Sequence, residues 1–172
     1  MSHTLSVLVE DKPGVLTRVA GLFARRGYNI NSLAVGPTEH PAMSRITLVV
    51  DVEDNVLEQV TKQLNKLVEV LKIVQLEPDS ARRQLLLIKV KAEPANRGQV
   101  LDVIQLFQAK AVDITGDTIT IESAGAPERM EALIKTLEPL GVKEIVQSGV
   151  VAIGRGSRSI SDRALRPGRT ES

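Results

Sequence analysis

The most restrictive feature of this sequence is the order in which its hydrophobic patterns follow one another. In residues 5–76 a β-rich run, an amphipathic helical pattern, two further β-rich runs, a second helical pattern and a last β-rich run occur in turn. After a polar break at Glu77–Ser80, the same order recurs. This βαββαβ order is the split-βαβ arrangement. The sequence therefore predicts an α+β protein with two ferredoxin-like βαββαβ domains.

The elements of the first half follow from residue type and spacing. Apolar residues at helical spacing predict helices from Val15 to Phe23 and from Leu57 to Leu67, and Asp54 or Asn55 is expected to cap the second helix. Gly27 is expected to end the first helix. The expected strands are Leu5–Val9, Asn29–Val35, Arg45–Val52 and Val70–Leu76.

The second half repeats the plan with little identity residue by residue. Helical stripes run from Val100 to Phe107 and from Met130 to Leu137, and Asn96 is expected to cap the first of these helices. Gly116-Asp117 predicts a two-residue hairpin. The expected strands are Gln84–Lys91, Val112–Thr115, Thr118–Glu122 and Val142–Val146, with Val150–Ile153 extending or adding to the last sheet.

These patterns predict domains at residues 1–77 and 78–156, followed by a mobile tail at 157–172. From Gly154 onward the chain has five arginines, two acids and almost no apolar periodicity, so this segment is either a solvated tail or one that seeks an acidic surface. Each predicted sheet has helices on one face only. We therefore expect the chain to dimerise, or its two halves to dock.

Composition excludes several classes of function. The chain has no cysteine, which removes thiolate metal sites and thiol catalysis, and its two histidines lack ligand spacing. Aromatic residues make up 2% of the chain, too few for the base-stacking sheets of RNA-binding domains, and the net charge is only +1. No apolar run approaches the roughly 20 residues of a membrane span. We expect a cytoplasmic protein without metal, nucleic acid or membrane.

The turn Asp11-Lys12-Pro13-Gly14 suggests an anion site. Pro13 suits the first position of a helix, and Gly14 lets another group approach the backbone. The amides of Gly14, Val15 and Leu16 then point out of the helix start and favour an anion. Asp11 would repel a phosphate but can hold an ammonium group, and it also argues against an acylphosphatase-type enzyme with a phosphate loop here. A ligand that carries both charges is an α-amino acid.

Asn29 and its neighbours extend this hypothesis. We expect Asn29 to bring its amide donors and acceptor to the same end of the sheet as the turn, and Ile30, Leu33 and Val35 suit a branched aliphatic side chain. The alternative is an ordinary turn in which Asp11 caps a helix.

Two stretches resemble a known family. Residues 5–50, LSVLVEDKPGVLTRVAGLFARRGYNINSLAVGPTEHPAMSRITLVV, resemble the start of the small, regulatory subunits of acetolactate synthase, and SGVVAIGRG at 148–156 resembles their C-terminal signature. The resemblance covers nearly the whole chain up to about Gly156. It implies an N-terminal ACT domain and a second ferredoxin-like domain.

The resemblance further implies regulation and no catalytic residues in this chain. Paired ACT domains of a homodimer would bind valine, or another branched-chain amino acid, at their interface, and the chain would activate a catalytic large subunit and confer feedback inhibition on it. That partner would carry thiamine diphosphate, Mg²⁺ and FAD. Many members have asparagine where this chain has Asp11. An ACT-type sensor for another biosynthetic enzyme is the alternative. The implied ligand-binding residues are Asp11, Gly14, Val15, Leu16, Asn29 and Ile30.

Overall fold

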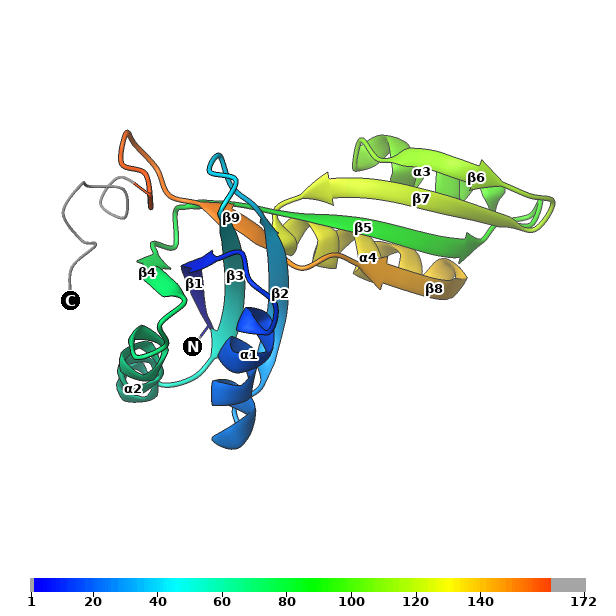
Figure 1. Ribbon diagram of the computed structural model, residues 1–172. Helices are drawn as coiled ribbons and strands as arrows, with labels where there is room; N and C mark the ends of the chain where they lie inside the picture. Colours follow the sequence, from blue (N-terminus) through cyan, green and yellow to red (C-terminus); the bar gives the residue numbers. More distant parts are fainter. Residues whose placement is uncertain (1, 162–172) are drawn as a thin grey trace. The chain divides into compact units, whose positions relative to one another are not determined.

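The computed structural model of the chain describes residues 2–161 and consists of two units (Figure 1). Of the described residues, one unit contains 2–81 together with 152–161, and the other is Arg82–Val151. Each unit contains an antiparallel sheet and two helices in βαββαβ order, which confirms the predicted α+β class and the two ferredoxin-like domains. Residues 162–172 of the predicted tail lie outside the described residues.

The first unit has a four-stranded sheet in the order β2-β3-β1-β4. Strand β1 pairs antiparallel with both β3 and β4, and β2 forms one edge of the sheet and pairs with β3. The elements of this unit are β1 (Ser2–Glu10), α1 (Val15–Arg25), β2 (Ile30–Pro37), β3 (Met43–Asp51), α2 (Asp54–Asn65) and β4 (Val70–Leu76).

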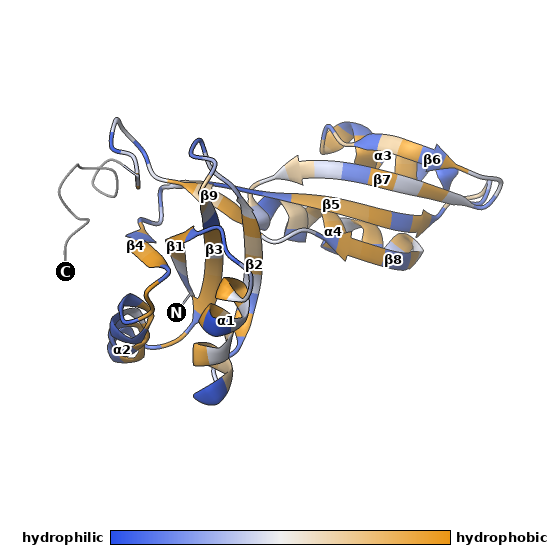
Figure 2. Cartoon of the chain, viewed as in Figure 1, coloured by the Kyte–Doolittle hydropathy of each residue, from blue (hydrophilic) through white to orange (hydrophobic). Residues whose placement is uncertain are grey.

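The core of this unit lies between the sheet and its two helices. Alternate residues of β1, Leu5, Val7 and Val9, pack with Val19 and Phe23 of α1, because successive strand residues point to opposite faces. The hydrophobic residues lie mainly along the strands, whereas hydrophilic residues gather on α2 and at the ends of α1 (Figure 2). The buried residues of this core lie at the positions that the helical and strand periodicities of the sequence predict.

Residues 152–161 contact the first unit on the side of its sheet that carries Arg45. Arg45 of β3 donates from Nη2 to the carbonyl oxygen of Ala152 at 2.8 Å, and Arg155 forms an ion pair with Asp79 at 2.8 Å. Ser161 donates to Oε1 of Glu39 at 2.6 Å, and this hydrogen bond lowers the pKa of the Glu39 carboxyl. The described part of the predicted tail therefore makes specific contacts with the first unit.

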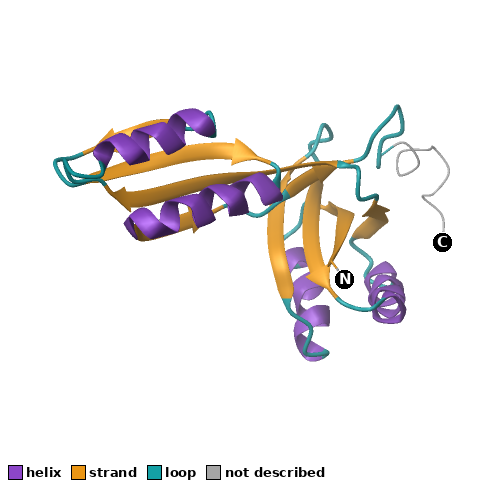
Figure 3. Cartoon of the chain, turned by 180° about the vertical axis from the view of Figure 1, so that it is seen from behind, coloured by secondary structure: helices purple, strands orange, loops and turns teal. Residues whose placement is uncertain are grey.

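The second unit has a sheet with the path β6-β7-β5-β8. Its helices lie together on one face of the sheet (Figure 3), and the core between them contains Leu86, Ile88, Val100 and Leu133. Its elements are β5 (Ala81–Lys91), α3 (Arg97–Leu106), β6 (Lys110–Ile114), β7 (Thr118–Gly125), α4 (Pro127–Gly141) and β8 (Val142–Gln147), and the short β9 (Val151–Ile153) follows where the chain passes back to the first unit.

The predicted cap of α2 was wrong, whereas Asn96 lies at the predicted N-cap position of α3 but makes no capping hydrogen bond. Glu53 precedes α2 and makes no side-chain capping hydrogen bond, so neither Asp54 nor Asn55 is the cap. Asn96 does precede α3, but its side-chain amide donates to the carbonyl oxygens of Lys91, at 3.0 Å, and Leu140, at 3.4 Å. These bonds are donated by the amide nitrogen and orient the side chain, and Oδ1, the atom that would accept a capping bond, has no hydrogen-bond partner among the described residues.

Candidate functional site

A left-handed glycine opens helix α1. Gly14 has φ of +84° and ψ of −6°, a conformation that glycine adopts without steric cost, and the helix begins at Val15. Pro13 therefore lies outside the helix, and its predicted place at the first helical position was wrong. The turn is tight, because the Lys12 amide donates to the carbonyl oxygen of Glu10 at 3.0 Å. The left-handed turn at Gly14 lets helix α1 begin at the next residue.

The start of α1 presents free hydrogen-bond donors. The Asp11 amide donates to Ala42 at 2.9 Å, and the Val15 amide makes only a long contact of 3.5 Å with the carbonyl oxygen of Lys12. Across residues 2–161, no acceptor is found for the amides of Gly14 and Leu16, and both residues are exposed. Solvent-accessible amides at a helix start favour an anion by about 0.3–1 kcal/mol.

Side-chain charges of both signs surround this helix start. Lys12 forms an ion pair with Glu10 at 2.9 Å, and this hydrogen bond raises the pKa of Lys12. Arg18 forms an ion pair with Glu69, at the residue before β4. Asp11 is exposed, and in the described part of the chain its carboxylate has no ion-pair partner. The site thus offers amide donors and a guanidinium for an anion, and one carboxylate for a cation.

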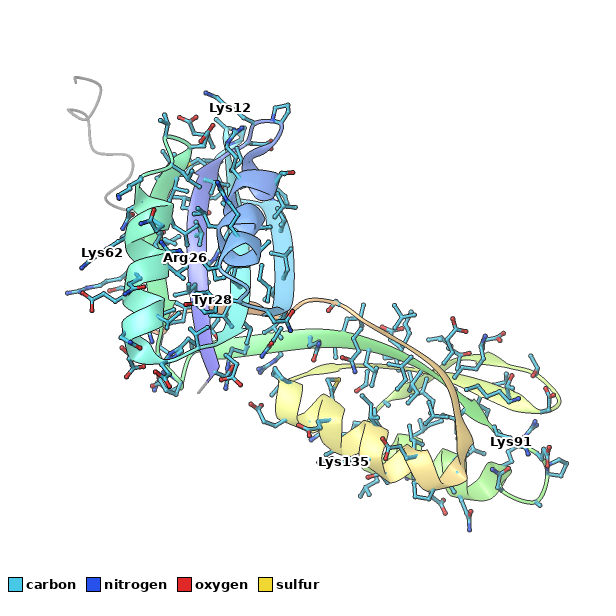
Figure 4. The ribbon with its side chains drawn as sticks, turned by 90° about the horizontal axis from the view of Figure 1, so that it is seen from below. Lys12, Arg26, Tyr28, Lys62, Lys91 and Lys135 are labelled. Atoms are coloured by element: carbon cyan, nitrogen blue, oxygen red, sulfur yellow. The ribbon has the colours of Figure 1, made fainter. Side chains whose placement is uncertain are left out.

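Asn29 and Ile30 lie at the other end of the sheet. Ile30 pairs with Val50, which pairs with His3 at the start of β1, whereas Glu10 at the end of β1 pairs with Met43. Lys12 and Tyr28, labelled in Figure 4, accordingly lie at the two ends of α1. The expectation that Asn29 shares one end of the sheet with the turn was wrong, because α1 carries the chain back along the whole sheet.

The predicted site residues therefore fall into two groups within one chain. The structure brings Asp11, Gly14, Val15 and Leu16 together, and it holds Asn29 and Ile30 apart from them. The side chain of Val15 is buried in the core, so only its backbone faces the helix start. Asn29 is exposed, and its side-chain amide makes a long contact of 3.4 Å with Oδ1 of Asn31.

Exposed aliphatic residues follow the free edge of the sheet. Leu33 and Val35 of β2 are 36% and 49% exposed, and Leu16 in the first turn of α1 is 40% exposed. Leu33 and Val35 pair with the core residues Leu48 and Ile46, so they lie on the helix-covered side of the sheet. An apolar ligand group held beside the start of α1 would find aliphatic neighbours there.

The described residues contain no group of three or more histidine, aspartate or glutamate residues that could hold a metal ion. Within the same residues, no helix is both long enough and apolar enough to cross a membrane.

Comparison with known proteins assigns the class of the first unit and then the family of the chain. The family model described as an AHAS small subunit-like ACT domain matches residues 5–72, so the first unit, with its βαββαβ sheet and glycine-opened helix, is an ACT domain. The model described as the small subunit of acetolactate synthase matches residues 83–156. The chain belongs to the family of acetolactate synthase small subunits.

Individual relatives agree with this assignment. The acetolactate synthase small subunit of Mycolicibacterium smegmatis is 60% identical over 160 residues, which cover 92% of this chain and 94% of the relative. A probable small subunit from Archaeoglobus fulgidus is 48% identical, with 92% and 99% coverage. The crystal structure of the small subunit from Thermotoga maritima aligns with a TM-score of 0.83 and 38% identity, and covers 92% of this chain and 99% of that one.

Proposed function

We propose that this chain is the regulatory subunit of an acetolactate synthase, and that it binds valine or another branched-chain amino acid through its ACT domain. It would activate a catalytic large subunit and confer feedback inhibition on it in the biosynthesis of the branched-chain amino acids, in the cytoplasm. Thiamine diphosphate, Mg²⁺ and FAD would belong to the catalytic partner. The observation that carries the proposal is the left-handed Gly14, which opens α1 with amides that find no acceptor among residues 2–161, next in sequence to Asp11, whose carboxylate has no ion-pair partner among the same residues.

The edge position of β2 supports a site shared by two chains. An edge strand presents unpaired backbone groups, which a second copy can pair. Both β1 and β2 run antiparallel to β3, so Pro37 at the end of β2 lies at the same end of the sheet as Glu10. In an antiparallel pair of β2 strands, the start of the partner's β2 meets the end of this one. Asn29 of the partner subunit would then come to the end of the sheet where Gly14 lies.

This arrangement matches the two charges and the side chain of an aliphatic amino acid. The amides of Gly14 and Leu16 would take the carboxylate, Asp11 would hold the ammonium group, and Asn29 and Ile30 of the partner subunit would close the site. Leu16, Leu33 and Val35 would contact the aliphatic side chain. Such a ligand touches both chains at once, and this is what allows it to favour one packing of the pair over another.

The size of the regulatory effect follows from linkage. A ligand shifts an equilibrium only by the difference between its affinities for the two states, and typical coupling free energies are about 1–3 kcal/mol. Valine bound at this interface would therefore change the activity of the catalytic subunit by roughly 5- to 150-fold. Such a ligand would act on two states of the dimer that are nearly equal in free energy. Reversing an equilibrium that strongly favours one state would need a difference of about 5.5 kcal/mol between the binding free energies of the two states.

Thermal melting of the isolated chain tests the sensor function. Valine at about 100 times its dissociation constant is expected to stabilise the folded dimer by about 2.7 kcal/mol, because it binds the folded state only. Leucine and isoleucine serve as competing ligands, and glycine, which has both charges but no side chain, serves as the control. The midpoint should rise with at least one branched ligand and remain unchanged with glycine at the same concentration.

An activity assay tests the subunit function separately. The purified catalytic subunit is assayed for acetolactate with and without this chain, and then with valine added. Stimulation by the chain without any response to valine, leucine or isoleucine would remove the sensor proposal and keep the activating one. Absence of stimulation would remove the activating role.

A further inference from the structure

The side chain of Arg18 lies over the glycine that opens α1. A Cβ atom added at Gly14 would be 3.3 Å from Nη1 of Arg18, so this guanidinium nitrogen already lies beside the backbone of the turn. Arg18 follows Gly14 by four residues, and residues with this spacing share one face of a helix. The guanidinium therefore lies beside the turn at which the amides of Gly14 and Leu16 find no acceptor within residues 2–161.

Glu69 fixes the orientation of this guanidinium. Nη2 of Arg18 donates to Oε1 of Glu69, whose side chain is only 20% exposed. The carbonyl oxygen of Glu69 also accepts the Glu10 amide at 2.9 Å, which attaches Glu69 to the end of β1. Because Glu69 engages Nη2, the neighbouring Nη1 remains on the side of Gly14.

The other charges at the turn are compatible with an anion beside Arg18. Glu10 is paired with Lys12, and Glu69 is paired with Arg18. Asp11 is exposed and has no ion-pair partner within residues 2–161, so it is available for a ligand cation. The carboxylate of a zwitterion would thus meet the guanidinium of Arg18, and its ammonium group would meet the carboxylate of Asp11.

We propose that Arg18 binds the ligand carboxylate directly through Nη1, and that Glu69 is the positioning residue that holds the guanidinium there. This inference rests on the proposed amino-acid site and adds its main carboxylate-specific contact. A guanidinium has five donors in a planar fork, so one carboxylate at Nη2 leaves donors at Nη1 for a second one. The site then selects amino acids with a free α-carboxylate over their amides.

A ligand pair that differs only in the carboxylate tests this role. Isothermal titration calorimetry measures the binding of valine and of valinamide to the full-length wild type, to Arg18→Met and to the control Arg25→Met. Arg25 is an exposed arginine at the far end of the same helix, where its Nε donates to the carbonyl oxygen of Gly21 at 3.3 Å. Because Arg18→Met would remove a hydrogen bond between charged groups, it should lower the affinity for valine by roughly 10- to 100-fold. The affinity of Arg18→Met for valinamide is expected to stay within about twofold of the wild-type affinity, because valinamide lacks the carboxylate that Arg18 would bind.

Glu69→Gln separates positioning from direct binding. Loss of the ion pair releases the guanidinium without removing it. The affinity for valine should therefore fall less than in Arg18→Met, and the affinity for valinamide should stay unchanged. Arg25→Met should leave the affinities of both ligands unchanged.

Three results would overturn the inference. Unchanged valine affinity in Arg18→Met would mean that the guanidinium does not contact the ligand. Equal losses for valine and valinamide would mean that Arg18 supports the fold of the site only. A wild-type protein that binds neither compound would reject the amino-acid site itself, and the role of Arg18 with it, whereas the first two results leave that site standing.

Discussion

Replacing Gly14 with aspartate is expected to lower the affinity of the chain for valine by at least about 100-fold. The new carboxylate would occupy the place of the ligand carboxylate and pair with Arg18, which lies 3.3 Å from the position of the added Cβ. A non-glycine residue at φ of +84° also costs about 1–2 kcal/mol. Calorimetry measures the affinity, and the assembled enzyme should lose its inhibition by valine while it keeps stimulation by this chain.

Two control variants separate competition by charge from backbone strain. Gly14→Ala has the same unfavourable φ without a carboxylate, so it should lose less affinity than Gly14→Asp. Gly156→Asp places the same side chain at another left-handed glycine, with φ of +88° and no atom within 4 Å of the added Cβ. It should bind valine as the wild type does. Equal losses in Gly14→Ala and Gly14→Asp would show that strain alone explains the effect.

Replacing Phe23 with alanine is expected to destabilise the first unit by about 3–5 kcal/mol, the usual range for removing a buried phenylalanine. Phe23 is 1% exposed and packs α1 against the sheet, and its carbonyl oxygen accepts the amides of Arg26 and Tyr28 at the helix end. Such a loss is a large part of the total stability of an ordinary domain. Because α1 carries the amides that are proposed to bind the ligand, valine binding should weaken as the unit opens.

Residue-resolved hydrogen exchange measures this effect in a protein with two units. The opening free energies of β1 and β3 should fall together in Phe23→Ala, while those of β5 and β7 in the second unit should change little. The control is Val68→Ala in the same unit, since Val68 is 86% exposed and its truncation should cost less than about 0.5 kcal/mol. Equal losses in both units would contradict the assignment of Phe23 to one separate core.

Much of the fold follows from hydrophobic periodicity alone. The spacing of Val15, Val19 and Phe23 predicts the buried face of α1, and the predicted strand Val70–Leu76 coincides with β4. The hairpin at Gly116-Asp117 exists, but β6 begins at Lys110 rather than Val112. Its register shifts between Ala111 and Asp113. A bulge of this kind leaves the apolar pattern intact, so it cannot be recognised from the pattern.

The site was harder to predict because its parts depend on tertiary geometry. The turn around Gly14 has a local signal in the sequence, whereas the place of Asn29 depends on the direction in which α1 returns along the sheet. No motif in the sequence singles out Arg18 as a binding residue. Its role depends on Glu69, which is 51 residues away in the sequence, and no local pattern predicts such a contact.

The segment after Ala152 was missed for the same reason. Its composition indicates a solvated tail, yet Ser161 is 4% exposed and bonded to Glu39, 122 residues earlier. A few specific long-range hydrogen bonds have no periodicity, so composition left a solvated tail and a segment that seeks an acidic surface as alternatives and could not locate these contacts.

The central claim is that one ligand site is built from the helix start of one chain and from Asn29 of its partner. Mixed dimers that pair a Gly14→Asp chain with an Asn29→Ala chain, purified with two different tags, test this claim most directly by calorimetry. Each mutant homodimer carries a defect in both of its sites. If each site is shared between the two chains, the mixed dimer has one site that contains both substitutions and one site that contains neither. We predict one valine bound per mixed dimer with wild-type affinity; a mixed dimer that binds as weakly as the two mutant homodimers would contradict the shared site.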